Sequence, residues 1–199
     1  MSVIQYADPS VSRCKFAREV AEYRALDEEY RRRGWFLANA EFPKVLVVLC
    51  APTLKPPAVV MGVTFDYTNY DAAPPSVRIV NPFTGEPYKF KELPSQLHHT
   101  LPAQEIALPG MQPGQKVPVI QAYMQGAPDE IPFLCLAGVR EYHDHPAHSG
   151  DIWELHRASG SGRLVRLLNI ICRYGVEPIV GFDVQLVPQV NLGYGFPPS

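Results

Sequence analysis

Charged side chains are scarce in this sequence, and neither sign dominates. Asp, Glu, Lys and Arg make up 19% of the 199 residues, with 18 basic against 20 acidic side chains, whereas about a quarter is usual for a globular domain. A chain so balanced has no overall electrostatic attraction to nucleic acid or to an anionic membrane. We therefore expect no nucleic acid and no membrane among its partners.

Long apolar runs and paired cysteines are also missing. The longest apolar run, Val45 to Ala51, is strand-sized and far below the ~20 residues that cross a bilayer, and no secretory signal is visible at the N-terminus. The four cysteines lie far apart with no C-x-x-C pair, at Cys14, Cys50, Cys135 and Cys172. This spacing favours free thiols in a cytoplasmic protein, with all but Cys135 serving as packing residues.

Proline is abundant, with 21 residues scattered among short apolar segments, so turns and long loops are expected. Apolar residues at spacings of three and four predict an amphipathic helix over 12–33, ended by Gly34, and a second helix over 162–174. Short apolar or alternating runs bounded by turn residues predict strands. These strands span 35–40, 44–51, 59–67 and 76–80.

The links between these strands are short and carry no helical pattern, which favours an antiparallel meander. A proline-rich stretch, 81–114, is expected to be irregular, followed by extended segments at 117–124, 131–139 and 177–190. The sequence therefore predicts one α+β domain over residues 1–199. Its core would span about 12–175, and 176–199 would be a C-terminal extension.

Four of the six histidines fall within fourteen positions, at His143, His145, His148 and His156, and Cys135 lies eight residues before the first. Structural histidines are usually solitary because each needs its own partners for two ring nitrogens. A cluster of this kind therefore indicates a site. Two other histidines, His98 and His99, are expected to be exposed loop residues.

Two kinds of chemistry fit this cluster. Neutral imidazoles spaced H-x-H-x-x-H are suited to a transition metal, most of all zinc, with Cys135, His156, Asp144 or Asp151 completing the ligand set. Alternatively, Cys135 is a nucleophile at the end of an apolar strand, because neighbouring imidazole or guanidinium groups favour the reactive thiolate. The residues alone leave both alternatives open.

The order of elements resembles the ubiquitin-conjugating (UBC) fold: a first helix, a four-stranded meander, a proline-rich stretch, a strand ending in Cys-Leu, a tryptophan and a helix. The segment Val63-Thr-Phe-Asp-Tyr67 with Pro74-Pro-Ser-Val-Arg-Ile-Val-Asn-Pro82 is similar to that family's middle strands. Cys135 falls where the family carries its thioester cysteine. Trp153 falls near the family's tryptophan, and we expect it to be a buried anchor.

The sequence departs from this family at one important place. The family's His-Pro-Asn tripeptide, whose asparagine helps to stabilise an oxyanion, is missing, since no histidine or asparagine lies between Met111 and Leu134. Divergent bacterial members with histidines after the cysteine are similar in this respect. The cluster after Cys135 is therefore expected to take over that role.

The resemblance implies an enzyme of a bacterial ubiquitin-like pathway. Cys135 would accept a ubiquitin-like protein from an activating enzyme as a thioester, and the first helix would dock that enzyme. His143 and His145 would act in acid/base or oxyanion roles, oriented by three side chains: Arg140, Asp144 and Asp151. No cofactor is needed for this chemistry.

Two alternatives stay open on the same scaffold. One is a zinc-binding protein, with zinc as the cofactor and its ligands drawn from Cys135, His143, His145, His148 and His156. The other is an inactive adaptor that only binds the ubiquitin-like protein.

Overall fold

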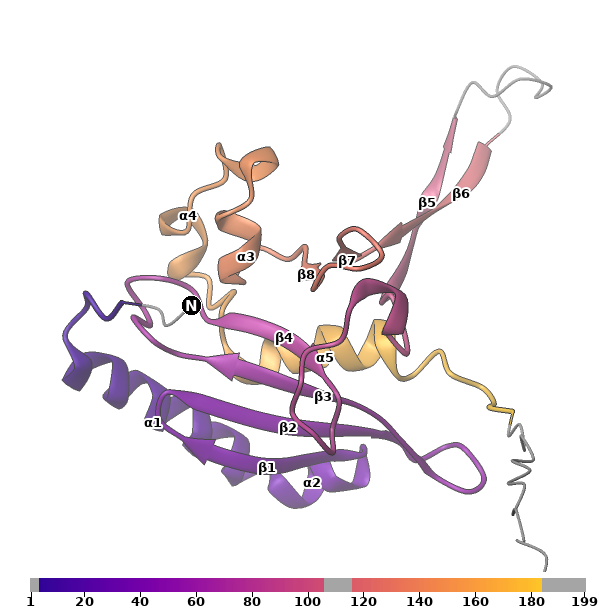
Figure 1. Cartoon of the computed structure of the whole chain (residues 1–199), viewed down its shortest axis with the longest axis horizontal. Helices are drawn as coiled ribbons and strands as arrows, with labels where there is room; N and C mark the ends of the chain where they lie inside the picture. Colours follow the sequence, from indigo (N-terminus) through magenta and orange to yellow (C-terminus); the bar gives the residue numbers. More distant parts are fainter. Residues whose placement is uncertain (1–3, 106–115, 184–199) are drawn as a thin grey trace, which may run out of the picture.

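An antiparallel sheet of four strands forms the centre of the computed structural model (Figure 1), in which residues 4–105 and 116–183 are described. Each strand pairs antiparallel with the next in the sequence, so the strand order is β1-β2-β3-β4. The strands are β1 (Trp35–Glu41), β2 (Lys44–Ala51), β3 (Ala58–Asp66) and β4 (Ser76–Val80). The predicted α+β class and the predicted meander are both confirmed.

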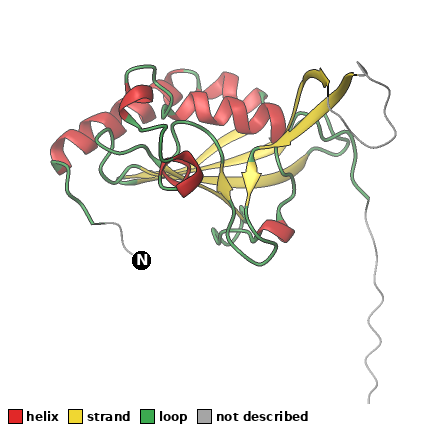
Figure 2. Cartoon of the chain, turned by 90° about the horizontal axis from the view of Figure 1, so that it is seen from above, coloured by secondary structure: helices red, strands yellow, loops and turns green. Residues whose placement is uncertain are grey.

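One face of this sheet is buried beneath the long helices. Along β2, Val45, Val47 and Leu49 are fully buried, while Leu46 and Val48 between them are partly exposed. Such alternation is expected because successive side chains of a strand point to opposite faces. Figure 2 shows the long helices lying on one side of the strands. The hydrophobic core therefore fills the layer between sheet and helices.

The predicted N-terminal helix is two helices, α1 (Pro9–Ala25) and α2 (Asp27–Arg32). The break lies at Leu26, whose φ of −123° and ψ of 23° are not helical. Spacing alone could not reveal this break, because the apolar stripe continues across it. The second predicted helix is confirmed as α5 (Leu164–Gly175).

The segment between β4 and α5 contains short elements. The described part of this segment forms two hairpins, and Figure 1 shows the first projecting away from the four-stranded sheet. They are formed by β5 (His98–Glu105) with β6 (Lys116–Ala122), and by β7 (Met124–Gln125) with β8 (Phe133–Leu134). The remaining elements are η1 (Phe90–Glu92), α3 (Arg140–His143), η2 (Pro146–His148) and α4 (Glu154–Arg157).

Three of the predicted segments differ from the structure. The stretch 81–114 is not wholly irregular, since β5 lies within it. The extended segment predicted over 131–139 is a strand only at Phe133–Leu134, after which the chain turns into α3. The extended segment predicted over 177–190 and the proposed C-terminal extension lie partly outside the described residues, and 177–183 contains no strand.

Two further sequence expectations concern the thiols and membrane spans. All four cysteines are free, as expected, but Cys14 is exposed on α1, so a packing role for it was wrong. Cys172 is buried in α5, where packing is confirmed. No helix in the described ranges combines the length and the apolar character that crossing a bilayer requires.

Candidate functional site

Cys135 follows β8 directly and is held there by the backbone. Its N–H donates to the carbonyl oxygen of Tyr123 at 2.7 Å, and the preceding residue, Leu134, is buried in the core. The side chain of Cys135 itself is only partly exposed. This burial raises the pKa of the Cys135 thiol above its usual value, because a thiolate loses hydration there. The resting thiol is therefore neutral unless a neighbouring group takes its proton.

His148 is the histidine that lies at the thiol. Its Nε2 is 3.5 Å from the Cys135 Sγ, within reach of a hydrogen bond to sulfur. The single turn η2, which begins at Pro146, brings the imidazole back toward β8. The ring of Tyr142 stacks on this imidazole, with centroids 4.0 Å apart and an angle of 22°. Cys135 and His148 thus form a thiol–imidazole pair that sequence reasoning missed, because it considered His148 only as a metal ligand.

His143 uses both of its ring nitrogens in hydrogen bonds to the backbone of the loop that follows Cys135. Its Nε2 accepts the Gly138 N–H at 3.2 Å, so this nitrogen carries no proton. Its Nδ1 therefore carries the proton and donates to the backbone carbonyl of Asp151 at 2.7 Å. Both ring nitrogens are used, and neither is available to a substrate in this arrangement.

His145 lies at the edge of the pair. Its ring stacks on Phe133 at 4.7 Å and is 5.7 Å from the ring of His148. Its Nδ1 accepts the Ala147 N–H at 3.3 Å, so its Nε2 is the protonated nitrogen. In an extended chain, His143 and His145 would share one face, but His143 lies in the helical turn α3, so the two rings have different surroundings.

Asp151 joins several side chains of the loop. Its carboxylate accepts the Tyr142 hydroxyl at 2.6 Å and the His156 Nε2 at 2.5 Å. The bond from Tyr142, followed by that from His156, lowers the pKa of the Asp151 carboxyl. In return, the hydrogen bond to Asp151 and, next, burial raise the pKa of Tyr142 to about 12. The phenol of Tyr142 therefore stays protonated and keeps its bond to Asp151.

Two side chains expected to orient the histidines do not reach them. The Arg140 guanidinium donates to the carbonyl oxygens of Pro74, through Nε at 3.2 Å, and of Thr68, at 2.5 Å. It fastens α3 to the segment between β3 and β4 and does not face the thiol. Asp144 is exposed, and its side chain makes no hydrogen bond within the described residues.

Sequence reasoning also missed Glu141, which accepts the Val77 N–H at 3.2 Å and pairs with Arg78.

The predicted zinc ligands are not assembled as a metal site. Among the described residues, no three side chains of His, Cys, Asp or Glu are placed to hold a metal ion together. His143 has no free nitrogen, and His156 bonds to Asp151. The donor set present therefore does not fit zinc in this arrangement, and the zinc hypothesis stays a prediction.

Trp153 is a buried anchor, as expected. It is 5% exposed, and its indole N–H donates to the Asp71 carbonyl at 3.0 Å.

His98 and His99 belong to β5 and not to a loop, and the Nδ1 of His99 lies 3.2 Å from the hydroxyl of Tyr123. This contact links β5 to Tyr123, whose carbonyl oxygen accepts the Cys135 N–H.

The basic side chains at the start of α1 already have partners. Lys15 bonds to Asp71 at 2.9 Å, and Arg18 pairs with the buried Glu19 at 2.8 Å. Arg13 lies over the ring of Phe42, 4.4 Å from its centroid. A docking role for this face is not tested by these contacts.

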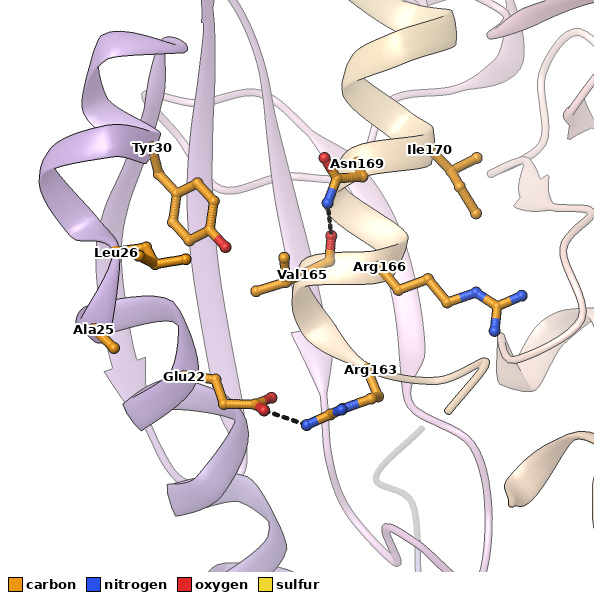
Figure 3. A pocket seen from close by; sticks show the side chains of 9 residues that line it. All are labelled: Glu22, Ala25, Leu26, Tyr30, Arg163, Val165, Arg166, Asn169 and Ile170. Carbon is orange, nitrogen blue, oxygen red and sulfur yellow. Dashed lines mark hydrogen bonds and ion pairs between the residues drawn. The ribbon is translucent and has the colours of Figure 1, made fainter. Parts of the chain in front are cut away.

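A cavity of about 650 Å³ lies apart from the thiol, between α1, α2 and α5 (Figure 3). Its walls combine apolar side chains such as Leu26 and Val165 with an ion pair between Glu22 and Arg163. It contains no residue of the loop that follows Cys135. The thiol–imidazole pair and this cavity are therefore separate features.

The chain was also compared with known proteins. The model of the Y4jH family, described as Y4jH-like, matches residues 7–179. The chain is 40% identical over 196 residues to "Uncharacterized protein y4jH" of Sinorhizobium fredii (strain NBRC 101917 / NGR234), covering 97% of this chain and 95% of that protein. Neither match names a ubiquitin-conjugating protein, so that resemblance stays a prediction. The matched region includes Cys135 and His148, the two partners of the thiol–imidazole pair. Because the family model and this relative both cover most of the sequence, the chain belongs to the Y4jH-like family.

Proposed function

We propose that this protein is a thiol acyl carrier of the ubiquitin-conjugating type, which holds a ubiquitin-like protein as a thioester on Cys135. The observation that carries the proposal is the 3.5 Å approach of the His148 Nε2 to the Cys135 Sγ. A partly buried thiol with a raised pKa needs a base beside it to become a nucleophile. The element order and the Cys-Leu placement support the choice of this family.

The chemistry needs two steps and no cofactor. In the first, His148 takes the thiol proton, the Cys135 sulfur attacks the thioester carbonyl on the activating enzyme, and that enzyme's sulfur leaves as a thiolate. A new carbon–sulfur bond forms as the old one breaks. His148 then passes the thiol proton to the departing thiolate and is neutral again. In the second step, an acceptor amine attacks the carbonyl, the Cys135 sulfur leaves as a thiolate, and His148 receives the amine proton and returns it to that thiolate. His148 thus replaces His143 and His145 in the acid/base role.

A glycine-terminated peptide thioester tests the first step without any partner protein. Intact and site-resolved mass spectrometry should show the acyl group on Cys135, in a form that excess thiol removes. His148→Gln should slow this transfer about a hundredfold, the lower end of the usual contribution of a general base. His98→Gln, a change of the same kind on β5, should leave the rate unaltered.

Exposed Cys14 serves as an internal reference in the same sample. Acylation of Cys135 that is no faster than that of Cys14, or that is indifferent to His148→Gln, would overturn the proposal. The inactive-adaptor alternative predicts that outcome. Stoichiometric zinc in protein purified without a histidine tag would instead favour the metal-binding alternative.

A further inference from the structure

The imidazole of His148 needs something to hold it at the thiol. A thiol makes only a weak hydrogen bond, so the 3.5 Å contact with sulfur cannot fix the ring alone, and the imidazole is carried by a single turn, η2. The ring of Tyr142 stacks on the imidazole with centroids 4.0 Å apart, closer than the ring of His145 at 5.7 Å. The orientation of His148 therefore depends on where Tyr142 lies.

Tyr142 is fixed in turn by Asp151. The phenol donates to one carboxylate oxygen at 2.6 Å, and the other oxygen accepts from His156 at 2.5 Å. The backbone of Asp151 adds two more bonds: its N–H donates to the His148 carbonyl at 2.9 Å, and its carbonyl accepts from His143 at 2.7 Å. Every polar group of this one residue is thus used inside the loop.

We propose that Asp151 is the positioning residue of this site: it holds Tyr142, and Tyr142 holds the His148 imidazole against the Cys135 thiol. This inference rests on the proposed function, because it assigns His148 the role of base. Asp151 does not touch the sulfur in this chain of contacts. It acts through an aromatic ring, which distinguishes the arrangement from a carboxylate that bonds directly to the base, as in the familiar triads.

Two other interactions support this chain. The pKa of the Asp151 carboxyl is lowered and that of the Tyr142 phenol is raised, so the bond between them persists across the neutral range. Arg140 and Glu141 fasten α3 to β4 and its preceding segment. Because the backbone of α3 is held in this way, loss of the Asp151 carboxylate should release side chains without displacing the helix.

The test measures alkylation of Cys135 by iodoacetamide at pH 7.5, resolved by site with mass spectrometry. Asp151→Asn should slow alkylation of Cys135 about tenfold, the size expected for losing one hydrogen bond to a charged group. Glu154→Gln makes the same chemical change on an exposed carboxylate three residues away, and should leave the rate unchanged. Tyr142→Phe keeps the stacked ring and removes only the hydroxyl, so it should slow the reaction in the same direction as Asp151→Asn.

A double-variant comparison separates positioning from general loosening of the fold. In a His148→Gln background, Asp151→Asn should cause no further loss, because the group it positions is already gone. An additive loss in that background, or equal rates for Asp151→Asn and Glu154→Gln, would overturn the inference. If Asp151→Asn does not fold, the same comparison with Tyr142→Phe decides.

Alkylation needs no acyl donor, so the two proposals fail independently. Coupled alkylation without peptide thioester exchange would reject the proposed function and keep Asp151 as the residue that positions the base. Exchange without coupling would reject the role of Asp151 and keep the proposed function.

Discussion

Gly138 offers a strict test of the loop geometry, because it lies three residues after Cys135 in a conformation that side chains rarely adopt. Its φ is +107°, and a Cβ atom there would lie 2.4 Å from the carbonyl oxygen of Ser161 and 2.9 Å from the nitrogen of Gly162. Contacts this short cannot persist, and both neighbours are backbone atoms. We therefore expect Gly138→Ala to displace the loop or the approach to α5.

The magnitude follows from two costs. The positive φ costs about 1–2 kcal/mol for a residue with a side chain, and forcing an extra methyl group into a packed site costs about 1–3 kcal/mol. Their sum is about 2–5 kcal/mol. For a chain of this size, that loss lowers the melting temperature by about 4–20 °C. Calorimetry or dye-monitored melting of the two purified proteins measures it directly.

Gly150→Ala is the matched control. Gly150 lies in the same loop, no heavy atom is found within 4 Å of a Cβ built on it, and its φ is not in the positive range. Its substitution should change stability by no more than about 0.5 kcal/mol. Equal melting temperatures for the two variants would refute the close approach of Gly138 to Ser161. Alkylation of Cys135 should also respond to the first variant and not to the second.

Two further predictions concern the core. Glu19 is 1% exposed and accepts the N–H of Leu164 at the start of α5. Glu19→Gln should lower the free energy of unfolding, measured with urea, by about 1–3 kcal/mol, because it weakens this helix cap and a buried ion pair. Glu22→Gln, at an exposed position, should lower it by less than about 1 kcal/mol. Burial raises the pKa of the Tyr67 phenol, so the stability it contributes is present below the ordinary phenol pKa of ~10 and is lost as pH rises above it. The melting temperature should therefore fall from pH 8 to 11, and it should fall less in Tyr67→Phe, because the Tyr67 hydroxyl is buried without a partner among the described residues. The same fall in both proteins would count against Tyr67 as the cause.

The strands could be predicted from the sequence because each is marked by local signals. β2 is a run of apolar residues between turn residues, and β4 begins directly after Pro74 and Pro75. In both strands the apolar segment and the turn residues beside it predict the same bounds. The break at Leu26 had no such signal, since the apolar stripe continues from Tyr23 to Tyr30 on both sides of it. Periodicity predicts which face is buried and not whether the backbone is continuous.

The site was predicted as a region but not as an arrangement. The clustering of histidines after Cys135 identified the loop that surrounds the thiol. Assigning roles within it required knowing the backbone, because an extended chain would have placed His143 and His145 together. The helical turn α3 instead directs His143 to Gly138 and Asp151, and η2 returns His148 to the sulfur.

The loop therefore divides its histidines into two groups by the hydrogen bonds that their nitrogens make. The rings of His143 and His156 are bonded to Asp151 and hold the loop together, whereas the ring of His145 bonds to the Ala147 N–H and that of His148 faces the Cys135 sulfur. A reactive thiol needs a base whose position is fixed but whose nitrogen is free. Histidines of the first group provide the rigidity that a histidine of the second group requires. For this reason a cluster of four imidazoles is consistent with one acid/base residue, and the clustering does not by itself call for a metal.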